Sequence, residues 1–222
     1  MIEKKNILGV GITNGTKEEI LEYIVKNLEN FKKKLFFVTP NPEFLVLANK
    51  NPKFKNVLNR ADLASSDGIG IIIAAKFLGK SLKGRFTGID LVESLCKEVA
   101  RKPITVGFLG GRSGVAEKTA ECLQKKYPGL KVNFVREEWP KGDFSSKMRG
   151  PVTRFPPASA PSSILMNDEV RAVGSPSSHA TPLDKPNSSA SGQAPSINNI
   201  DILFVAFGAP KQEMWINENL DK

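Results

Sequence analysis

The sequence has little of what disulfide-linked and membrane-spanning proteins require. Its 222 residues include only two cysteines, and no apolar run approaches the roughly 18 residues of a membrane-spanning helix. No secretory signal pattern opens the chain, so we expect a cytosolic protein. In that compartment Cys96 and Cys122, which both fall in helical patterns, are expected to be reduced and mostly buried thiols.

Acidic residues are too few to balance the basic ones. The net charge is +9 and the pI is near 9.5, which favours an anionic partner such as a phosphorylated substrate or an anionic membrane surface. The chain has no arginine-rich run and no interleaving of basic with aromatic residues, so nucleic acid is not expected as a partner. Apolar content of 40% is ordinary for a soluble globular chain.

The chain is organised around residues 35–70, where two predicted strands each end in a polar residue. The expected order is a strand, two helices and a second strand, at 35–38, 43–50, 52–61 and 62–65. Thr39 follows the first strand and Asp67 follows the second. In open α/β sheets ligands bind at the carboxyl edge of the strands, so both are candidate site residues. Alternatively, Thr39 begins a turn and Asp67 caps the next helix.

The rest of the chain alternates short apolar runs with helical patterns. Further strands are expected at 104–109, 132–135 and 202–207, and further helices at 71–78, 91–100, 115–126 and from 210 onward. This order predicts an α/β fold, with mostly parallel sheets, helices on both faces and two Rossmann-like lobes around a cleft. Residues 1–103 are expected to form the N-terminal lobe with the catalytic residues, and 104–222 the C-terminal lobe on the nucleotide side. The almost wholly apolar helix at 71–78 is expected to lie deep in the core.

Two glycine-rich stretches are candidates for phosphate binding. The stretch from Gly110 to Gly114 joins a strand to a helix, where backbone amides and the helix dipole favour an anion. The simpler interpretation is an ordinary tight turn. The stretch from Gly9 to Gly15 lacks an acidic residue at the end of a well-placed second strand, so we interpret its glycines as turn residues. A nucleotide-dependent oxidoreductase using either loop is the alternative function, and a non-catalytic interaction module is a third.

Residues 145–196 differ in composition from the rest of the chain. They hold eight of the 15 prolines, 12 serines and the single histidine, His179, without useful periodicity. Such a composition cannot bury enough apolar surface to offset the entropy lost on ordering. We therefore expect a Pro/Ser-rich, disordered insertion, and we assign His179 no catalytic role.

Four motifs carry a resemblance to a known family. In chain order they are TPNPEFLVLANKNPKF, RADLASSDGIGIIIAAKFLGK, GRFTGIDL and ILFVAFGAPKQEMWI. Together they closely resemble the WecG/TagA/CpsF glycosyltransferase family, over residues 5–144 and 197–222. In the family pattern a short helix joins the two parts that correspond to residues 5–144 and 197–222. We therefore interpret residues 145–196 as an insertion.

The resemblance implies an inverting sugar transfer. Its substrates would be UDP-N-acetylmannosamine as donor and N-acetylglucosamine on undecaprenyl diphosphate as acceptor. The product would be the β-linked disaccharide lipid of wall teichoic acid linkage-unit synthesis. Transfer of N-acetylmannosamine uronic acid in a related pathway is the alternative. A single displacement of this kind needs a base for the acceptor hydroxyl and stabilisation of the leaving diphosphate.

The resemblance also implies roles for particular residues. Asp67 is the expected base, with a pKa raised by the apolar Ile69 and Ile71, and Thr39 is expected beside it in the catalytic set. The remaining expectations are substrate binding by Asn41, Arg85 and Gln212, and nucleotide binding by Gly110, Gly111, Arg112 and Lys211.

No cofactor is expected. Many sugar-nucleotide transferases hold a divalent ion with a D-x-D motif, and its absence here predicts metal independence. Family members usually continue past residue 222 into a basic, amphipathic segment, thought to attach the enzyme to the membrane and to complete the active site. We therefore expect a truncated, poorly active chain of a protein that is peripheral at the inner face of the bacterial cell membrane. Apolar surface left uncovered by the missing segment would favour homo-oligomers.

Overall fold

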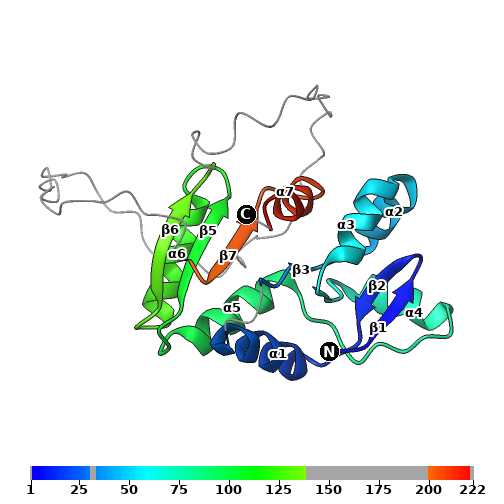
Figure 1. Cartoon of the computed structure of the whole chain (residues 1–222), viewed down its shortest axis with the longest axis horizontal. Coiled ribbons are helices and arrows are strands. Elements are labelled where there is room, and N and C mark those ends of the chain that lie inside the picture. Colours follow the sequence, from blue (N-terminus) through cyan, green and yellow to red (C-terminus); the bar gives the residue numbers. More distant parts are fainter. Residues whose placement is uncertain (1, 31–33, 139–199, 221–222) are drawn as a thin grey trace, which may run out of the picture. The chain divides into compact units, whose positions relative to one another are not determined.

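The computed structural model of the chain describes residues 2–30, 34–138 and 200–220 (Figure 1). The predicted insertion at 145–196, with His179, lies outside the described residues. Within these ranges helices and strands alternate along the chain. The α/β class predicted from the sequence is therefore confirmed.

The described elements follow the predicted order closely. The strands are β1 (Lys4–Ile7), β2 (Val10–Thr13), β3 (Phe37–Val38), β4 (Leu63–Ala64), β5 (Thr105–Gly110), β6 (Lys131–Arg136) and β7 (Ile202–Ala206). The helices are α1 (Lys17–Asn30), α2 (Pro42–Lys50), α3 (Pro52–Arg60), α4 (Ile69–Phe77), α5 (Gly88–Val99), α6 (Val115–Lys126) and α7 (Lys211–Asn219).

Strand pairing divides the described strands among three small sheets. β1 and β2 form an antiparallel hairpin, and β3 and β4 pair in parallel. β6, β5 and β7 form a parallel sheet in that order, seen side by side in Figure 1. The parallel pairing agrees with the prediction. The division into two lobes near residue 103, with a cleft between them, stays a prediction.

The turn between β1 and β2 confirms the interpretation of Gly9 as a turn residue, whereas Gly11 lies within β2. Gly9 has a φ of 87°, which favours glycine, and its N–H donates to Asn6 Oδ1 at 2.9 Å. A dinucleotide-binding loop needs a strand that leads through the glycines into a helix. An antiparallel hairpin at this point excludes that arrangement, so the oxidoreductase alternative loses its first loop.

Helices α2 and α3 begin for the same local reason. Asn41 and Asn51 each accept a hydrogen bond through Oδ1 from the backbone N–H three residues further on, at 3.0 and 3.1 Å. A proline follows each asparagine at the start of the helix. The side chain satisfies an amide that the helix leaves unpaired, and proline has no N–H to satisfy. The two N-P dipeptides thus decide where both helices start.

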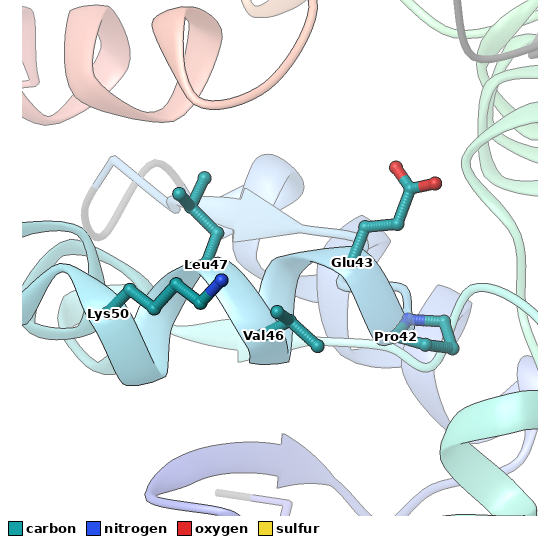
Figure 2. Close-up of a pocket in the computed structure, with 5 residues that line it drawn as sticks. All are labelled: Pro42, Glu43, Val46, Leu47 and Lys50. Carbon is teal, nitrogen blue, oxygen red and sulfur yellow. The ribbon is translucent and has the colours of Figure 1, made fainter.

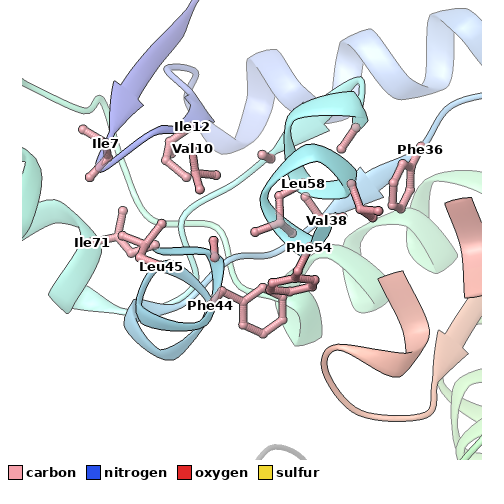
Figure 3. Close-up of a cluster of buried hydrophobic side chains, with 14 of the residues drawn as sticks. Ile7, Val10, Ile12, Phe36, Val38, Phe44, Leu45, Phe54, Leu58 and Ile71 are labelled. Carbon is pink, nitrogen blue, oxygen red and sulfur yellow. The ribbon is translucent and has the colours of Figure 1, made fainter. Parts of the chain in front are cut away.

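One apolar cluster supports the β3–β4 pair (Figure 3). Within it Phe44 of α2 and Phe54 of α3 lie with ring centroids 5.6 Å apart in a tilted arrangement. The cluster also contains the buried Ile7, Val10, Ile12, Phe36, Val38, Leu45, Leu58 and Ile71. Such close-packed side chains tolerate little displacement, so the ends of β3 and β4 rest on a rigid support.

A second cluster joins the parallel sheet to α5 and α6. Phe108 of β5 stacks on Phe204 of β7 with ring centroids 5.3 Å apart. Cys96 of α5 is fully buried there, and burial raises the pKa of its thiol to about 12. The prediction of a buried thiol is thus confirmed for Cys96. It is wrong for Cys122, which is exposed because α6 turns a different face, with Ala120 and Leu123, to the core.

Helix α4 is less buried than the sequence predicts. Ile71 and Ala75 are buried, but Ile69, Ile73 and Phe77 are 64%, 47% and 88% exposed. Residues four apart lie on the same side of a helix, so these three form one exposed apolar face. An all-apolar helix is fully buried only where other elements surround it. Among the described residues no element covers this face, and the expectation of a deeply buried helix is wrong.

Candidate active site

Thr39 and Asp67 lie just past the carboxyl ends of β3 and β4, where strand order predicts them. The two strands pair in parallel. Backbone hydrogen bonds continue beyond the strands, from Ser65 N to Val38 O at 3.1 Å and from Asp67 N to Pro40 O at 2.7 Å. The two segments that carry the candidate catalytic residues therefore stay side by side.

The side chain of Asp67 is half-buried and does not cap the helix that follows it. The cap position of α4 is Gly68, with a φ of 97°, and no side chain caps this helix. Burial raises the pKa of the half-buried Asp67 carboxyl above its usual value; Arg85 lowers this pKa and Asp90 raises it further. The direction agrees with the prediction, but Ile69 is largely exposed and so cannot supply the burial expected of it. A raised pKa makes a carboxylate a stronger base.

Two buried serines, which sequence reasoning missed, hold the loop that carries Arg85. Ser65 Oγ donates to Phe86 O at 2.7 Å, and Ser66 Oγ donates to Gly84 O at 2.9 Å. These bonds fasten the backbone on both sides of Arg85 to the end of β4. The signal in the sequence was a pair of serines directly after a buried strand, because a buried hydroxyl needs a partner.

Thr39 lies against the first turn of α5. A Cβ atom on Gly88 would lie 3.3 Å from Thr39 Oγ1, so the glycine allows the helix start to come close. A capping box fixes that start: Thr87 Oγ1 accepts from Asp90 N at 3.1 Å and donates to Asp90 Oδ2 at 2.7 Å. The helix start at Thr87 to Asp90, the TGID part of the GRFTGID motif, therefore packs next to Thr39.

The side chain of Asn41 caps α2, and this use of its oxygen competes with the sugar binding predicted from the sequence. Its Oδ1 caps α2 through the bond from Phe44 N. A cap of this kind contributes about 1 kcal/mol to stability. The Nδ2 group is the part of the side chain that the cap does not engage. Sugar binding by Asn41 therefore stays a prediction, in which the residue acts as a hydrogen-bond donor.

The second set of predicted residues gathers at the carboxyl edge of the β6–β5–β7 sheet. Gly110 lies opposite Ala206 in the β5–β7 register, and Gly111 N donates to Ala206 O at 3.1 Å. A Cβ atom on Gly110 would lie 2.5 Å from the same carbonyl oxygen, so only glycine fits there. The turns after β5 and β7, both predicted to bind the nucleotide, are thereby joined.

The turn after β5 is less open to an anion than the sequence predicts. Glu137, just past β6, accepts a hydrogen bond from Gly114 N at 2.5 Å, at the start of α6. A carboxylate at a helix N-terminus occupies the position that favours a phosphate. Nucleotide binding by Gly110, Gly111 and Arg112 stays a prediction, in which the exposed Arg112 side chain is the group left to contact phosphate.

Helix α7 opens with the two other residues predicted to meet the donor. Lys211 is exposed and Gln212 is half-buried. Gln212 Oε1 accepts from Gly208 N at 3.2 Å, and its Nε2 donates to Glu213 Oε1 at 2.7 Å. Both bonds hold the Gln212 side chain against the backbone and side chain of residues 208–213. The sequence predicted that Gln212 lies in a pocket, but it did not predict these bonds.

The structure therefore assembles each set of predicted residues at its own sheet edge. Thr39, Asp67 and Arg85 belong to the β3–β4 edge, and the two glycines and α7 belong to the edge of the larger sheet. Helix α7 also contacts α3, where Arg60 Nη1 donates to Asn217 Oδ1 at 3.0 Å. Through this contact the helix that carries Lys211 and Gln212 packs against α3, which belongs to the apolar cluster beneath Thr39 and Asp67.

A hollow of about 360 Å³ lies on the surface of α2 (Figure 2), and none of the predicted site residues lines it. Figure 2 shows that its lining side chains come from this one helix: Pro42, Glu43, Val46, Leu47 and Lys50. Ligand sites usually enclose most of the ligand between several elements. This hollow has no such surroundings and is not a candidate substrate site.

Metal-ligating side chains do not gather in residues 2–30, 34–138 or 200–220. No group of three or more histidine, cysteine, aspartate or glutamate residues in these ranges could hold a metal ion. Metal independence stays a prediction for the chain as a whole. None of the helices described in these ranges is long and apolar enough to cross a membrane.

The part of the chain that carries the β3–β4 edge, together with β5 and β6 of the larger sheet, matches a known protein family. The model of the glycosyl transferase WecG/TagA/CpsF family matches residues 5–161. This chain belongs to that family, and the matched residues include the first three of the four motifs that carry the resemblance.

Two curated relatives have the same name, N-acetylglucosaminyldiphosphoundecaprenol N-acetyl-beta-D-mannosaminyltransferase. The protein from Bacillus spizizenii is 37% identical over 97 residues, which cover 44% of this chain and 38% of the relative. The protein from Staphylococcus aureus is 31% identical over 128 residues, which cover 57% of this chain and 50% of the relative. The matched part of this chain thus spans half or less of the length of these relatives.

Proposed function

We propose that this chain transfers N-acetylmannosamine from UDP-N-acetylmannosamine to N-acetylglucosamine on undecaprenyl diphosphate. Membership of the glycosyltransferase family and the names of the relatives support the sugar, the acceptor and the class of reaction. The UDP donor, the inverting course and the place in wall teichoic acid linkage-unit synthesis are parts of the proposal. We choose N-acetylmannosamine over its uronic acid because the relatives' names specify the former.

The observation that carries the proposal is the group of Thr39, Asp67 and Arg85 at one sheet edge. Asp67 is a half-buried carboxyl with a raised pKa and an arginine near enough to affect it. Single displacement at an anomeric carbon needs a proton acceptor and a cation to offset the charge of the leaving group. These residues supply both, and Thr39 adds a hydroxyl that can orient the acceptor.

In the proposed step the acceptor hydroxyl oxygen attacks the anomeric carbon of the donor from the side opposite the diphosphate. Asp67 takes the hydroxyl proton as the new C–O bond forms. The bond from the anomeric carbon to the diphosphate oxygen breaks, and UDP leaves with the electron pair. An α-linked donor therefore gives a β-linked product. Arg85 and Lys211 offset the charge on the diphosphate, a task that many transferases give to a metal ion.

A UDP-release assay with UDP-N-acetylmannosamine and a short-chain, lipid-linked N-acetylglucosamine acceptor tests this function. We expect UDP release that depends on the acceptor and is unchanged by EDTA, because protein cations and not a metal offset the diphosphate charge. Thermal-shift measurements are expected to show stabilisation by UDP and none by NAD.

Three outcomes would contradict parts of the proposal. Activity lost in EDTA and restored by Mg²⁺ or Mn²⁺ would refute metal independence. Faster turnover of the uronic acid donor would reassign the sugar. Stabilisation by NAD and not by UDP would support the oxidoreductase alternative, which would then have to use the turn after β5.

We also propose that the protein works at the surface of an anionic phospholipid bilayer. The acceptor in the relatives' name carries an undecaprenol chain, which resides in a membrane. The exposed apolar face of α4, formed by Ile69, Ile73 and Phe77, begins two residues after Asp67. Lys76 is exposed on the same helix, three residues after Ile73. Apolar side chains together with lysine are typical of surfaces that meet anionic headgroups.

Phe77→Ser is expected to weaken binding to vesicles of phosphatidylglycerol and phosphatidylcholine about tenfold, since burying a phenylalanine contributes roughly 1.5–3 kcal/mol. The fold should be unaffected because Phe77 is 88% exposed. Vesicle co-sedimentation measures the effect, with Val115→Ser on α6 as the control for an exposed apolar residue elsewhere. Unchanged vesicle binding, or a change in self-association instead, would contradict a lipid partner for this face.

A further inference from the structure

The proposed reaction leaves the carboxyl of Glu213, which lies buried in the first turn of α7, without a role. The side chain is only 2% exposed. Its Oε1 accepts the bond from Gln212 Nε2, whereas Oε2 has no partner among the described residues. Burial raises the pKa of this carboxyl. An unpaired buried polar atom costs stability, so a residue of this kind needs a reason beyond packing.

Glu213 decides which way round the amide of Gln212 points. On one side the amide faces a donor, Gly208 N–H, and on the other it faces an acceptor, Glu213 Oε1. Only one orientation satisfies both, with Oε1 toward the N–H and Nε2 toward the carboxyl. The reverse orientation would set oxygen against oxygen and N–H against N–H. With an apolar side chain at position 213, the acceptor for Gln212 Nε2 would be missing, and the amide orientation would no longer be fixed on that side.

The bonds already made determine what Gln212 can offer to a ligand. One Nε2 hydrogen and one Oε1 lone pair are engaged, so one hydrogen and one lone pair remain. A hydroxyl or an acetamido group both donates and accepts, and can therefore use both. A phosphate at neutral pH mainly accepts hydrogen bonds, so it could use the remaining hydrogen but not the remaining lone pair.

We propose that Glu213 is a positioning residue that orients Gln212 to recognise a hydroxyl or acetamido group of the transferred sugar. The diphosphate is left to Lys211, the exposed cation one residue earlier. This inference rests on the proposed function, because it requires a sugar nucleotide at the turn after β7. In this proposal Lys211 binds the charged diphosphate, whereas Gln212 and Glu213 together recognise the sugar.

Isothermal titration calorimetry of the full chain with UDP and with UDP-N-acetylmannosamine separates the two kinds of recognition. Glu213→Met removes the acceptor and keeps a buried side chain of similar size. It is expected to weaken binding of the sugar nucleotide about tenfold and binding of UDP less than about twofold. Glu213→Gln keeps an acceptor oxygen and is expected to recover most of the lost affinity. In steady-state assays the Met variant should raise KM more than it lowers kcat.

Glu218→Met is the matched control, because Glu218 lies on the same helix but is exposed. It is expected to bind both ligands as the unaltered chain does. Thermal unfolding supplies a second control. Glu213→Met removes a buried oxygen that lacks a partner, so its Tm is expected to stay equal or to rise.

The outcomes separate this inference from the function on which it rests. Equal losses for UDP and the sugar nucleotide, a fall in Tm that accompanies the loss, or no recovery in Glu213→Gln would each overturn the positioning role. Any of these would leave the proposed function standing, provided that the unaltered chain binds both ligands. An unaltered chain that binds neither UDP nor the sugar nucleotide would overturn the proposed function, and this inference with it.

Discussion

Asp67→Asn is expected to lower the rate of sugar transfer about 1,000-fold, within the range of roughly 10²–10⁴ that a general base contributes. Asparagine has nearly the same shape and polarity as aspartate but cannot accept the proton of the acceptor hydroxyl. Binding of UDP should be retained, because the proposed contacts to the diphosphate come from other residues. Acceptor-dependent UDP release measures the rate, and calorimetry measures the binding.

The pH dependence of the same variant separates lost chemistry from lost stability. The pKa of Asp67 is raised in the folded protein, so the folded state holds this proton more tightly than the unfolded state. The contribution of Asp67 to stability therefore falls as pH rises from the unfolded pKa through the folded one. Asp67→Asn removes that cost, and its Tm at neutral pH is expected to be equal or higher. In the unaltered chain, activity should fall in acid with an apparent pKa above the usual aspartate value.

Glu22→Gln is a suitable control for this experiment, since Glu22 is an exposed carboxylate on α1. It should leave the rate, the pH profile and the Tm unchanged. Substantial activity in Asp67→Asn, or a loss of rate explained by a lower Tm, would rule out Asp67 as the base.

Gly110→Ala is expected to destabilise the protein by about 3 kcal/mol, from backbone strain and overpacking together. Gly110 has a φ of 104°, and a Cβ atom there would lie 2.5 Å from Ala206 O. Either the β5–β7 pairing or the turn must shift, and the Gly111-to-Ala206 hydrogen bond would weaken. For a chain of this size we expect a fall in Tm of roughly 6–12 °C, measured by thermal unfolding.

Gly114→Ala provides the matched control for Gly110→Ala. Gly114 also has a positive φ, 75°, but a Cβ atom there would meet no atom within 4 Å. Only the strain of the left-handed conformation remains, about 1 kcal/mol. If the two variants lowered the Tm equally, close approach to Ala206 would not explain the glycine at position 110.

Much of the local structure could be predicted because its causes lie within a few residues. The helix starts at Asn41-Pro42 and Asn51-Pro52 depend on a side chain and the amide three positions away. The start of α1 has a cause of the same range, a capping box in which Thr16 N donates to Glu19 Oε2 and Glu19 N donates to Thr16 Oγ1. The residues that set these helix starts are therefore adjacent in the sequence.

The candidate site could be predicted in part, for a topological reason. Parallel strands have their carboxyl ends at the same edge of a sheet. The order of strands in the sequence was therefore enough to predict that Thr39 and Asp67 lie close together. It did not indicate that Ser65 and Ser66 would bind a loop about 20 residues away. Nor did it indicate that Glu137 would occupy the start of α6, since that contact joins residues from separate elements.

The sequence by itself determined the α/β order of elements, the starts of α2 and α3 and the family membership of this protein. Only the tertiary structure decided that one face of α4 is exposed, that Cys122 faces outward and that Glu213 is buried beside Gln212. Periodicity records how apolar a helix face is, whereas burial depends on which distant segments pack against it. The same separation applies to the candidate site: strand ends placed Asp67, and tertiary packing raised the pKa of its carboxyl.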